Sequence, residues 1–565
     1  MVVSQEIGGL SSLAANETRK IVKVTYRKNV KAGAASAELD QDFLKECFVN
    51  NGTVDELANI QSNASIVLGR VGSGKSAALQ FLEENFKTHR IDPQEFSLSY
   101  IENSDAIQLL SELGVNLDNL FQALWKHVLT VELIRAKYVL DGKSGDLKFW
   151  NKVFRPASTK SAEKAAIDYF DEFGGTEFWQ TTETRVKEII KRIDQCVESE
   201  VGSDVKTIRA KVAAKLGVSD QERSEIIQKC NTAVNGVQIQ KLHQVISMLD
   251  EIFSDSSDNY YLLIDDLDTY WASNTIRFRL IRSLIETVKR FRKVRTAKIV
   301  VALRTDLLDT VIRETRDSGF QEEKYEDYFQ RIHWTPSDII EVVDQRIRKV
   351  FKDQYTRSDV GFYDIFPEKI GSEYTQNYFV ERTALRPRDA IIFLNRIFEE
   401  LAGKTAITKR IVQEAEKNYS EGRFSSLCEE WSDRYPNLES HLSFLKGMPS
   451  RFLLSEVPIE RVNAQIMEYM DCDPKDELTE FSGQFVDRFG EAGNSAQAKS
   501  FLSAVFTVLQ QVGAIGAKFD ATGRPEWTSD RIAMFNNRRF ELDTQIYVHP
   551  MLFRTLGIKP VGKAK

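Results

Sequence analysis

The chain has 565 residues, of which 42% are hydrophobic and 28% charged, and its formal net charge is -7. The length predicts several domains, and the composition excludes extensive disorder. The negative charge excludes a global electrostatic attraction to nucleic acid, so a contact with DNA or RNA would need a local basic patch.

The cysteines and the apolar stretches indicate the compartment. The five cysteines form no C-x-x-C pair, which argues against a zinc site or a disulfide framework and fits a reducing environment. No stretch reaches the length of about 18 apolar residues that a membrane span requires. The N-terminus also lacks the apolar centre of a secretion signal. We therefore expect a cytoplasmic protein without membrane contact.

The first 50 residues form an N-terminal extension with a basic stretch. Six basic residues lie between Arg19 and Lys31, before the first following acid, Glu38. Two interpretations remain open, an interaction arm and an exposed strand edge protected by lysines.

The strongest motif is "SIVLGRVGSGKSAALQFLEE", residues 65–84. It matches G-x-x-x-x-G-K-[ST] and lies between a short apolar strand and a helix, as a phosphate-binding P-loop requires. Backbone N–H groups of such a loop cradle phosphates at a helix N-terminus. Lys75 would contact the β and γ phosphates, and the Ser76 hydroxyl would bind Mg²⁺. The predicted nucleotide-binding residues are Gly69, Arg70, Val71, Gly72, Ser73, Gly74, Lys75, Ser76 and Ala77. The alternative is a merely flexible Gly/Ser turn.

A long helical insertion follows the P-loop. A second strand is predicted at 95–102, and apolar spacing predicts helices at 117–137, 182–199 and 239–254. We therefore place a P-loop core at 51–104 and 241–345, with residues 105–240 inserted into it.

The stretch "NYYLLIDDLDTYW", residues 259–271, places three aspartates at the end of a buried strand. Carboxylates beside an apolar run need a compensating partner, and a P-loop would supply one. Asp265 is predicted to hold Mg²⁺ and Asp266 to polarise the attacking water. The alternative is an acidic turn that caps a helix starting near Thr269. Asp268 lies beyond the usual pair, and helix capping is the interpretation left for it.

Three arginines follow as candidates to complete the site. Arg304 ends a buried strand at 298–303, where it could sense the γ-phosphate. Arg331 could act as an arginine finger toward a neighbouring active site, or form an ordinary surface ion pair. Arg388 follows Pro387 at the start of a helix in a predicted helical lid, residues 346–420, and could reach the nucleotide. Arg386 is the alternative to Arg388.

The C-terminal part, residues 421–565, reads as helix, strand, turn and strand followed by a further strand and helix. This order resembles a winged-helix module, with Asp520 to Arg524 as the wing turn. From Arg451 to Lys565 there are 14 basic and 15 acidic residues, without the positive surplus of a DNA-reading wing. Protein interaction is therefore favoured over DNA binding.

The segments "GRVGSGKS", "YLLIDDLD", "IVVALRT" and "LRPRD" together resemble the AAA+-related STAND and KAP class of P-loop ATPases. The resemblance covers roughly residues 50–400 and is closest to bacterial ATPases associated with antiphage defence loci. It implies an α/β fold in which a parallel sheet carries the P-loop, the acidic strand end and a sensor strand and is followed by a helical lid. The helical insertion and the C-terminal winged-helix-like module, both read from the residues, complete the predicted fold. No L-S-G-G-Q or N-K-x-D motif is present, which disfavours ABC-type ATPases and Ras-type GTPases.

The leading hypothesis is an ATPase that uses Mg-ATP binding and hydrolysis as a conformational switch. The resemblance implies a role in antiphage defence, as a homo-oligomer or in complex with an effector protein. One alternative is a DNA-binding ATPase of origin-recognition or transposition-regulator type. Another is an ATP-binding scaffold with little turnover.

Overall fold

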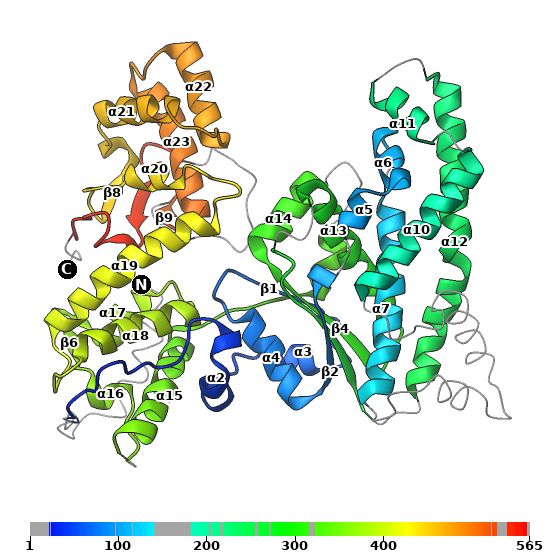
Figure 1. The fold of residues 1–565 in the computed structure, drawn as a ribbon. Helices are drawn as coiled ribbons and strands as arrows, with labels where there is room; N and C mark the ends of the chain where they lie inside the picture. Colours follow the sequence, from blue (N-terminus) through cyan, green and yellow to red (C-terminus); the bar gives the residue numbers. More distant parts are fainter. Residues whose placement is uncertain are drawn as a thin grey trace. The chain divides into compact units, whose positions relative to one another are not determined.

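The structure is a computed structural model in which the chain forms two compact units (Figure 1). The sheet unit contains residues 50–70 and 75–333, and the helical unit contains residues 1–49, 71–74 and 334–565. The structure describes residues 22, 24–95, 98–115, 117–140, 182–202, 205–214, 218–254, 258–269, 273–315, 322–356, 358–520, 522–527 and 540–561.

The sheet unit is built on five parallel strands in the order β2-β3-β4-β1-β5. The central strands are continuous apolar runs, and every residue of β1 and β3 is buried, as in parallel sheets covered on both faces. Parallel pairing brings the carboxyl ends of all five strands to one edge. The strands are β1 (Ile66–Gly69), β2 (Lys87–Ile91), β3 (Tyr260–Ile264), β4 (Ala297–Arg304) and β5 (Phe329–Arg331).

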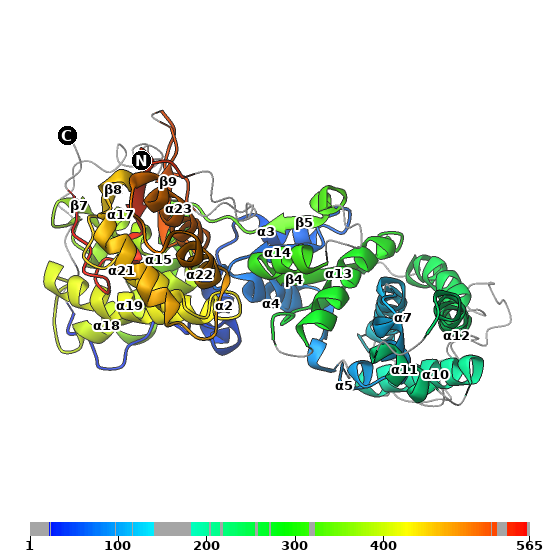
Figure 2. The same cartoon turned by 90° about the horizontal axis from the view of Figure 1, so that it is seen from above.

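Helices cover both faces of this sheet (Figures 1 and 2). One face packs against α3 and α4, and the other against α7 and α13. The alternate residues Leu262 and Ile264 of β3 share a core with the second pair of helices. The helices are α3 (Thr53–Ala58), α4 (Lys75–Asn85), α7 (Asp118–Leu140), α13 (Asn274–Phe291) and α14 (Thr305–Glu314).

The predicted helical insertion is continuous with the core of the sheet unit. The buried indole of Trp125, on α7, donates a hydrogen bond of 2.8 Å to the Leu280 carbonyl on α13. The insertion is therefore an extension of the sheet's own core. The other described helices between β2 and β3 are α5 (Leu98–Glu102), α6 (Asp105–Glu112), α10 (Thr182–Val201), α11 (Val205–Ala213) and α12 (Asp220–Ser254).

The second strand predicted at 95–102 is wrong. The strand is β2, residues Lys87–Ile91, and residues Leu98–Glu102 form helix α5. The apolar alternation in "EFSLSYIE" is too short to separate a strand from a helical turn. The strand "KTHRI" is an edge strand in which only Ile91 is buried, so it has no apolar pattern to reveal it.

The helical unit packs its N-terminal segment against its central helices. Tyr26 is buried against Phe351 and Phe398, and Asp40 forms a buried ion pair with Arg346. The described part of the basic N-terminal stretch contains no strand. The segment includes α2 (Gln41–Cys47), and the central helices are α15 (Pro336–Gln354), α16 (Phe362–Ile365), α17 (Thr375–Arg382), α18 (Pro387–Leu401) and α19 (Lys409–Glu430).

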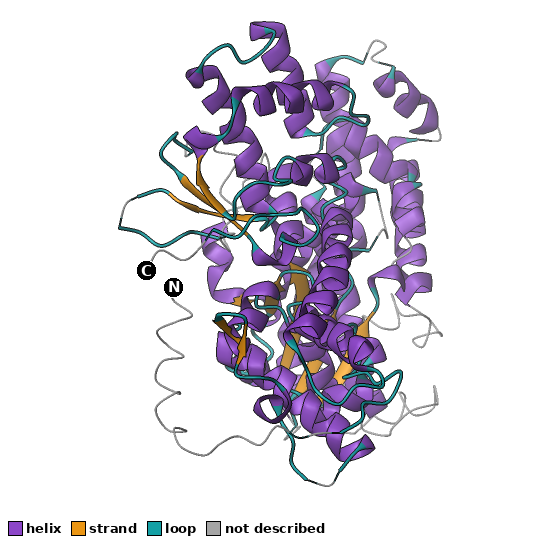
Figure 3. Cartoon of the chain, turned by 90° about the vertical axis from the view of Figure 1, so that its left-hand side faces the viewer, coloured by secondary structure: helices purple, strands orange, loops and turns teal. Residues whose placement is uncertain are grey.

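The C-terminal part of the helical unit combines helices with an antiparallel sheet in the order β8-β10-β9 (Figure 3). Asp520 accepts backbone hydrogen bonds in the predicted wing turn, and Ala517 bridges to Glu526. The winged-helix assignment remains a prediction. The elements are α20 (Leu438–Ser443), β8 (Arg451–Leu453), α21 (Ile459–Met470), α22 (Glu477–Phe489), α23 (Ser495–Gln511), β9 (Ile515–Lys518) and β10 (Gln545–Val548).

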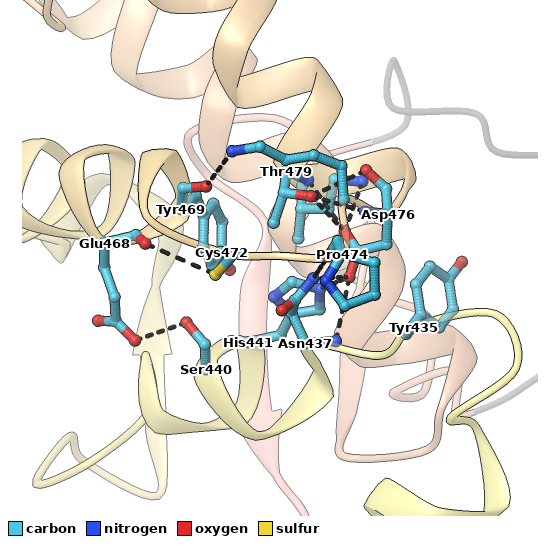
Figure 4. Close-up of polar contacts among 12 residues, drawn as sticks. Tyr435, Asn437, Ser440, His441, Glu468, Tyr469, Cys472, Pro474, Asp476 and Thr479 are labelled. Atoms are coloured by element: carbon cyan, nitrogen blue, oxygen red, sulfur yellow. Dashed lines mark hydrogen bonds and ion pairs between the residues drawn. The ribbon is translucent and has the colours of Figure 1, made fainter.

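A buried polar network joins α20 to the start of α22 (Figure 4). His441 Nε2 lies 3.0 Å from Asp476 Oδ2, and the other carboxylate oxygen of Asp476 accepts the Thr479 backbone N–H. Burial favours the neutral acid, but the contact with His441 and the backbone donors hold the pKa of Asp476 well below its usual range. Asp476 thus caps α22 as a carboxylate.

Among the described residues, no helix combines the length and the apolar character needed to cross a bilayer.

The buried ion pair of the helical unit predicts a large loss of stability. Arg346 donates to both carboxylate oxygens of Asp40, and both side chains are only 3% exposed. Asp40→Ala leaves the guanidinium buried without its counter-ion, so we expect the free energy of unfolding to fall by about 3 to 5 kcal/mol. Chemical denaturation measures this loss. Glu46→Ala, which removes an exposed partner of Lys349, is the control and should cost less than about 1 kcal/mol. Equal, small losses would contradict the prediction.

A second prediction concerns Lys298, at the start of β4. Its amine donates to the carbonyls of Glu56 and Asn59, and burial lowers its pKa to about 7. Between pH 7 and the pKa of an unfolded lysine, about 10.4, the unfolded chain binds a proton that the folded chain does not. Stability should therefore rise with pH in this window, relative to Lys298→Met, by up to about 1.4 kcal/mol per pH unit.

Denaturation at several pH values measures this difference between the native chain and Lys298→Met. The exposed Lys293→Met, which also removes one lysine, is the matched control. A difference for Lys298→Met that does not change with pH would show that the Lys298 amine stays charged in the fold.

Candidate nucleotide-binding site

The P-loop begins where β1 ends at Gly69 and finishes at Lys75, the first residue of α4. Gly72 and Gly74 adopt φ values of 76° and 97°, in the left-handed region that favours glycine. Lys75 Nζ donates to the carbonyls of Gly69 and Arg70, at 3.1 Å each. The Ser73 hydroxyl is buried and finds no hydrogen-bond partner among the described residues. The loop is thus a tight backbone cradle with a lysine folded over its base.

The tip of the loop, Val71–Gly74, belongs to the helical unit. Trp334 Nε1 donates to the Ser73 carbonyl at 2.8 Å, and the Arg388 backbone N–H donates to the Gly72 carbonyl at 3.3 Å. A Cβ atom on Gly72 would lie 2.8 Å from the Arg388 Cβ, so only glycine fits this approach. The start of α18 therefore contacts the loop tip directly.

The two candidate lid arginines differ in their surroundings. Arg388 packs along Gly72, while its Nε donates to the Ala35 carbonyl at 3.1 Å. Arg386 is buried and its Nη1 lies 3.2 Å from Glu430. Arg388 is thus the one that lies at the P-loop, and its role toward nucleotide remains a prediction.

The acidic strand end is ordered by hydrogen bonds to Asp265. Its Oδ1 accepts the backbone N–H of Asp266 at 3.0 Å, and its Oδ2 accepts Arg90 Nη2 at 2.9 Å. The Asp265 carboxylate is 7% exposed, whereas that of Asp266 is 58% exposed. Asp266 adopts a φ of 58°, an uncommon conformation for a residue other than glycine. One carboxylate is therefore fixed and buried, and its neighbour faces solvent.

Asp268 lies in the same charge cluster and is not a helix cap. The next helix, α13, starts at Asn274 with Ser273 at its N-cap position. Asp268 Oδ2 lies 3.2 Å from Arg304 Nη1 at the end of β4, and Arg304 Nε also donates to Asp306 at 3.1 Å. Asp268 therefore does not cap α13, contrary to the helix-capping interpretation of the sequence, because the N-cap residue of that helix is Ser273.

The electrostatics of Lys75 reflect this cluster. Burial lowers the pKa of Lys75 to about 8, although the carboxylates of Asp268 and Asp265 favour its charged form. The buried Arg277 also donates to the Thr269 carbonyl at 3.1 Å and to Asn274. Lys75 is thus a cation that adjacent carboxylates help to keep charged.

Arg331 forms a long ion pair within the sheet unit. Its Nη2 lies 3.4 Å from Glu326, and its side chain is 20% exposed. Its role as an arginine finger remains a prediction.

The donor set at this edge fits Mg²⁺ bound together with nucleotide phosphates. The Ser76 hydroxyl and the Asp265 carboxylate are oxygen ligands, which Mg²⁺ prefers. Magnesium bound to a nucleotide takes only one or two protein ligands because phosphates and water supply the others. Among the described residues, no group of three or more His, Cys, Asp or Glu side chains is arranged to hold a metal ion.

The five-stranded parallel sheet, the glycine-built loop after β1 and the acidic end of β3 together define a P-loop NTPase fold. The chain also matches the model of the KAP family P-loop domain over residues 58–363, more than half of its length. The chain therefore belongs to the KAP family. A second model, the FunZ-associated C-terminal helical domain, matches residues 337–428. No curated protein matches the chain.

Two contributors to this site were missed by the sequence analysis. Arg90 lies on a polar edge strand without apolar alternation, and Trp334 follows β5 in a segment where the sequence analysis singled out only Arg331. The signal for Trp334 was a single large aromatic next to a Thr-Pro helix start. For Arg90 the sequence offered no signal beyond its charge.

The position of Asp268 predicts an effect on nucleotide affinity. Its carboxylate competes with phosphate oxygens for the Lys75 and Arg304 cations, so Asp268→Asn should bind metal-free ATP about three- to tenfold more tightly. Equilibrium titration with a fluorescent ATP analogue measures this change. Asp258→Asn, at the opposite end of β3 and paired with Lys87, is the control. Unchanged or weaker binding in Asp268→Asn would show that Asp268 instead supports the site.

Proposed function

We propose that this chain binds Mg-ATP and hydrolyses it, and that the nucleotide state acts as a conformational switch. The observation that carries the proposal is the meeting of Lys75 with Asp265 and Asp268 at the carboxyl edge of the sheet. A part-buried lysine beside a glycine cradle suits a triphosphate, and the buried carboxylate of Asp265 suits the accompanying metal. Membership of the KAP family supports the same chemistry.

In the proposed mechanism, the P-loop N–H groups and Lys75 bind the β and γ phosphates. Ser76 and Asp265 would hold Mg²⁺, which would supply positive charge against the charge that develops on the phosphates. Asp266, the more exposed of the neighbouring acids, orients the attacking water and accepts its proton. Arg304 lies between Asp268 and Asp306 at the end of β4. When the nucleotide binds, Arg304 would release one of these carboxylates and bind the γ-phosphate instead.

The switch is supported by a strained turn in the helical unit. Ala384 and Leu385 both adopt positive φ values, of 48° and 52°, immediately before α18. Such conformations cost of the order of 1 kcal/mol or more each for residues other than glycine. They persist only where the surroundings hold them. The turn leads to Arg388, whose backbone contacts the P-loop tip.

A buried ion cluster holds this turn to α19. Glu430 lies 3.2 Å from Arg386 Nη1 and 2.8 Å from Arg423 Nη2, and Arg423 Nη1 lies 3.7 Å from Asp389. The ion cluster and the turn at Ala384 and Leu385 thus link the P-loop tip to the long helix α19, which leads into the C-terminal module. In the proposal, this connection carries the nucleotide state toward the C-terminal module.

The role assigned to the switch is antiphage defence, in which the chain controls a partner effector or acts as a homo-oligomer. This part of the proposal is supported by the resemblance to ATPases of defence loci and by the match to the FunZ-associated helical domain. The five cysteines are free thiols, which suits the reducing cytosol.

The DNA-binding alternative is less well supported by the C-terminal part. Its longest described helix, α23, buries the run from Phe501 to Phe506 in the core, and its single basic residue, Lys499, pairs with Glu541. A helix that reads a DNA groove presents exposed basic and polar side chains instead. We therefore retain DNA binding as an outcome of the test and not as a second proposal.

The test is steady-state ATP hydrolysis by the full chain, with and without duplex DNA. Lys75→Ala removes the phosphate contact and Asp266→Asn removes the water-orienting carboxylate, so each should lower turnover at least about 100-fold. Lys87→Ala, an exposed lysine on β2, is the matched control and should leave turnover unchanged.

The possible outcomes separate the hypotheses. If neither substitution lowers turnover, the catalytic assignment is wrong. Strong stimulation by DNA would favour the DNA-binding ATPase. Tight ATP binding by the native chain without turnover would favour the scaffold.

A further inference from the structure

Arg90 occupies a position in the site to which neither the family motifs nor the proposed mechanism gives a role. It lies on the edge strand β2, whose register places Arg90 beside Leu263, just before the acidic end of β3. Its guanidinium faces three carboxylates. Nη2 lies 2.9 Å from Asp265 and 4.0 Å from Asp266, and Nη1 lies 3.5 Å from Glu83.

The pair with Asp265 uses the carboxylate that the proposed mechanism gives to Mg²⁺. Asp265 Oδ1 already accepts the Asp266 backbone N–H, and Oδ2 accepts Arg90. A carboxylate that is 7% exposed cannot be left without a counter-charge at modest cost. Arg90 therefore supplies, at Asp265, the positive charge that a metal ion would otherwise supply.

Glu83 offers Arg90 a second partner. It lies on α4, the helix that follows the P-loop, and its side chain is 30% exposed. The 3.5 Å separation from Nη1 means that Arg90 can move fully to Glu83 by a small change of side-chain conformation. The guanidinium thus has an acceptor available when it leaves Asp265.

We propose that Arg90 is a positioning residue that holds Asp265 by occupying its metal-binding oxygen, and that it transfers to Glu83 when Mg-ATP binds. This proposal rests on the proposed function, since it concerns the same metal-binding carboxylate. It goes further by naming the residue that sets how strongly nucleotide binding depends on magnesium. With Arg90 on Asp265, metal-free ATP meets a neutralised carboxylate. With Arg90 absent, the same triphosphate meets an uncompensated negative charge.

The measured quantity is the ratio of two dissociation constants of the full chain for a fluorescent ATP analogue, the first in EDTA and the second in excess Mg²⁺. In Arg90→Gln, the uncompensated Asp265 repels the metal-free triphosphate and attracts the metal-bound form. The ratio should therefore rise at least tenfold over the native value. Arg90→Lys keeps the charge and should stay within threefold of the native ratio.

Glu83→Gln provides a second, independent test because it leaves the Arg90–Asp265 pair intact. Without its alternative acceptor, Arg90 remains on Asp265 and opposes the metal-bound form, so the ratio should fall about threefold or more. Lys87→Gln, on the same strand but paired with Asp258, is the control and should keep the native ratio. Thermal unfolding of each variant verifies that it is folded.

The proposal is overturned if the ratio in Arg90→Gln stays within twofold of the native ratio. If Arg90→Gln does not fold, the same criterion applies to Glu83→Gln. A fall of the ratio in Arg90→Gln also overturns it, because Arg90 would then orient Asp265 for the metal. A failure of the proposed function gives a different result, because the native chain would then bind the ATP analogue neither in EDTA nor in excess Mg²⁺.

Discussion

Strand β4 pairs in parallel with both β1 and β3, so the ends of β1 and β3 lie at the same edge of the sheet. This pairing brings Lys75 close enough to Asp265 and Asp268 to interact with their charges, although a long insertion separates them in the sequence. Burial works against the charge of this lysine, and Asp268 and Asp265 work in its favour. The arrangement around it follows from that balance. Arg304, Arg277 and Arg90 each hold a group of the acidic strand end in place. The site is therefore a set of compensated charges, in which each charged side chain changes the electrostatic energy of its neighbours.

The P-loop and the acidic strand end could be predicted because their residue types are required at fixed spacing. Glycine is needed at Gly72 and Gly74 by their positive φ angles, and Asp265 follows an apolar run that can only be a buried strand. These constraints are local, so the sequence displays them. The parallel sheet and the helical insertion followed from the same motifs and from apolar spacing, although one strand of the sheet was placed wrongly.

The parts that could not be predicted depend on contacts between distant segments. Arg90 lies on a strand with a single buried residue, and its partner is known only once β2 pairs with β3. Asp268 resembled a helix cap because local patterns cannot show that its partner, Arg304, ends another strand. For the N-terminal segment the sequence left an arm and a strand edge open, because its anchors, including Arg346, lie far along the chain.

The left-handed backbone at Asp266 has a consequence for which side chains the position can accept. Asparagine and aspartate adopt this conformation more readily than other residues with a side chain, whereas β-branched residues are strained there. The backbone thus restricts the position to short polar side chains before any chemistry is considered. Glutamate, although it carries the same charge, would be disfavoured by the conformation and would extend its carboxylate further by one methylene. The main-chain conformation at Asp266 therefore determines how far the carboxylate can extend from the backbone.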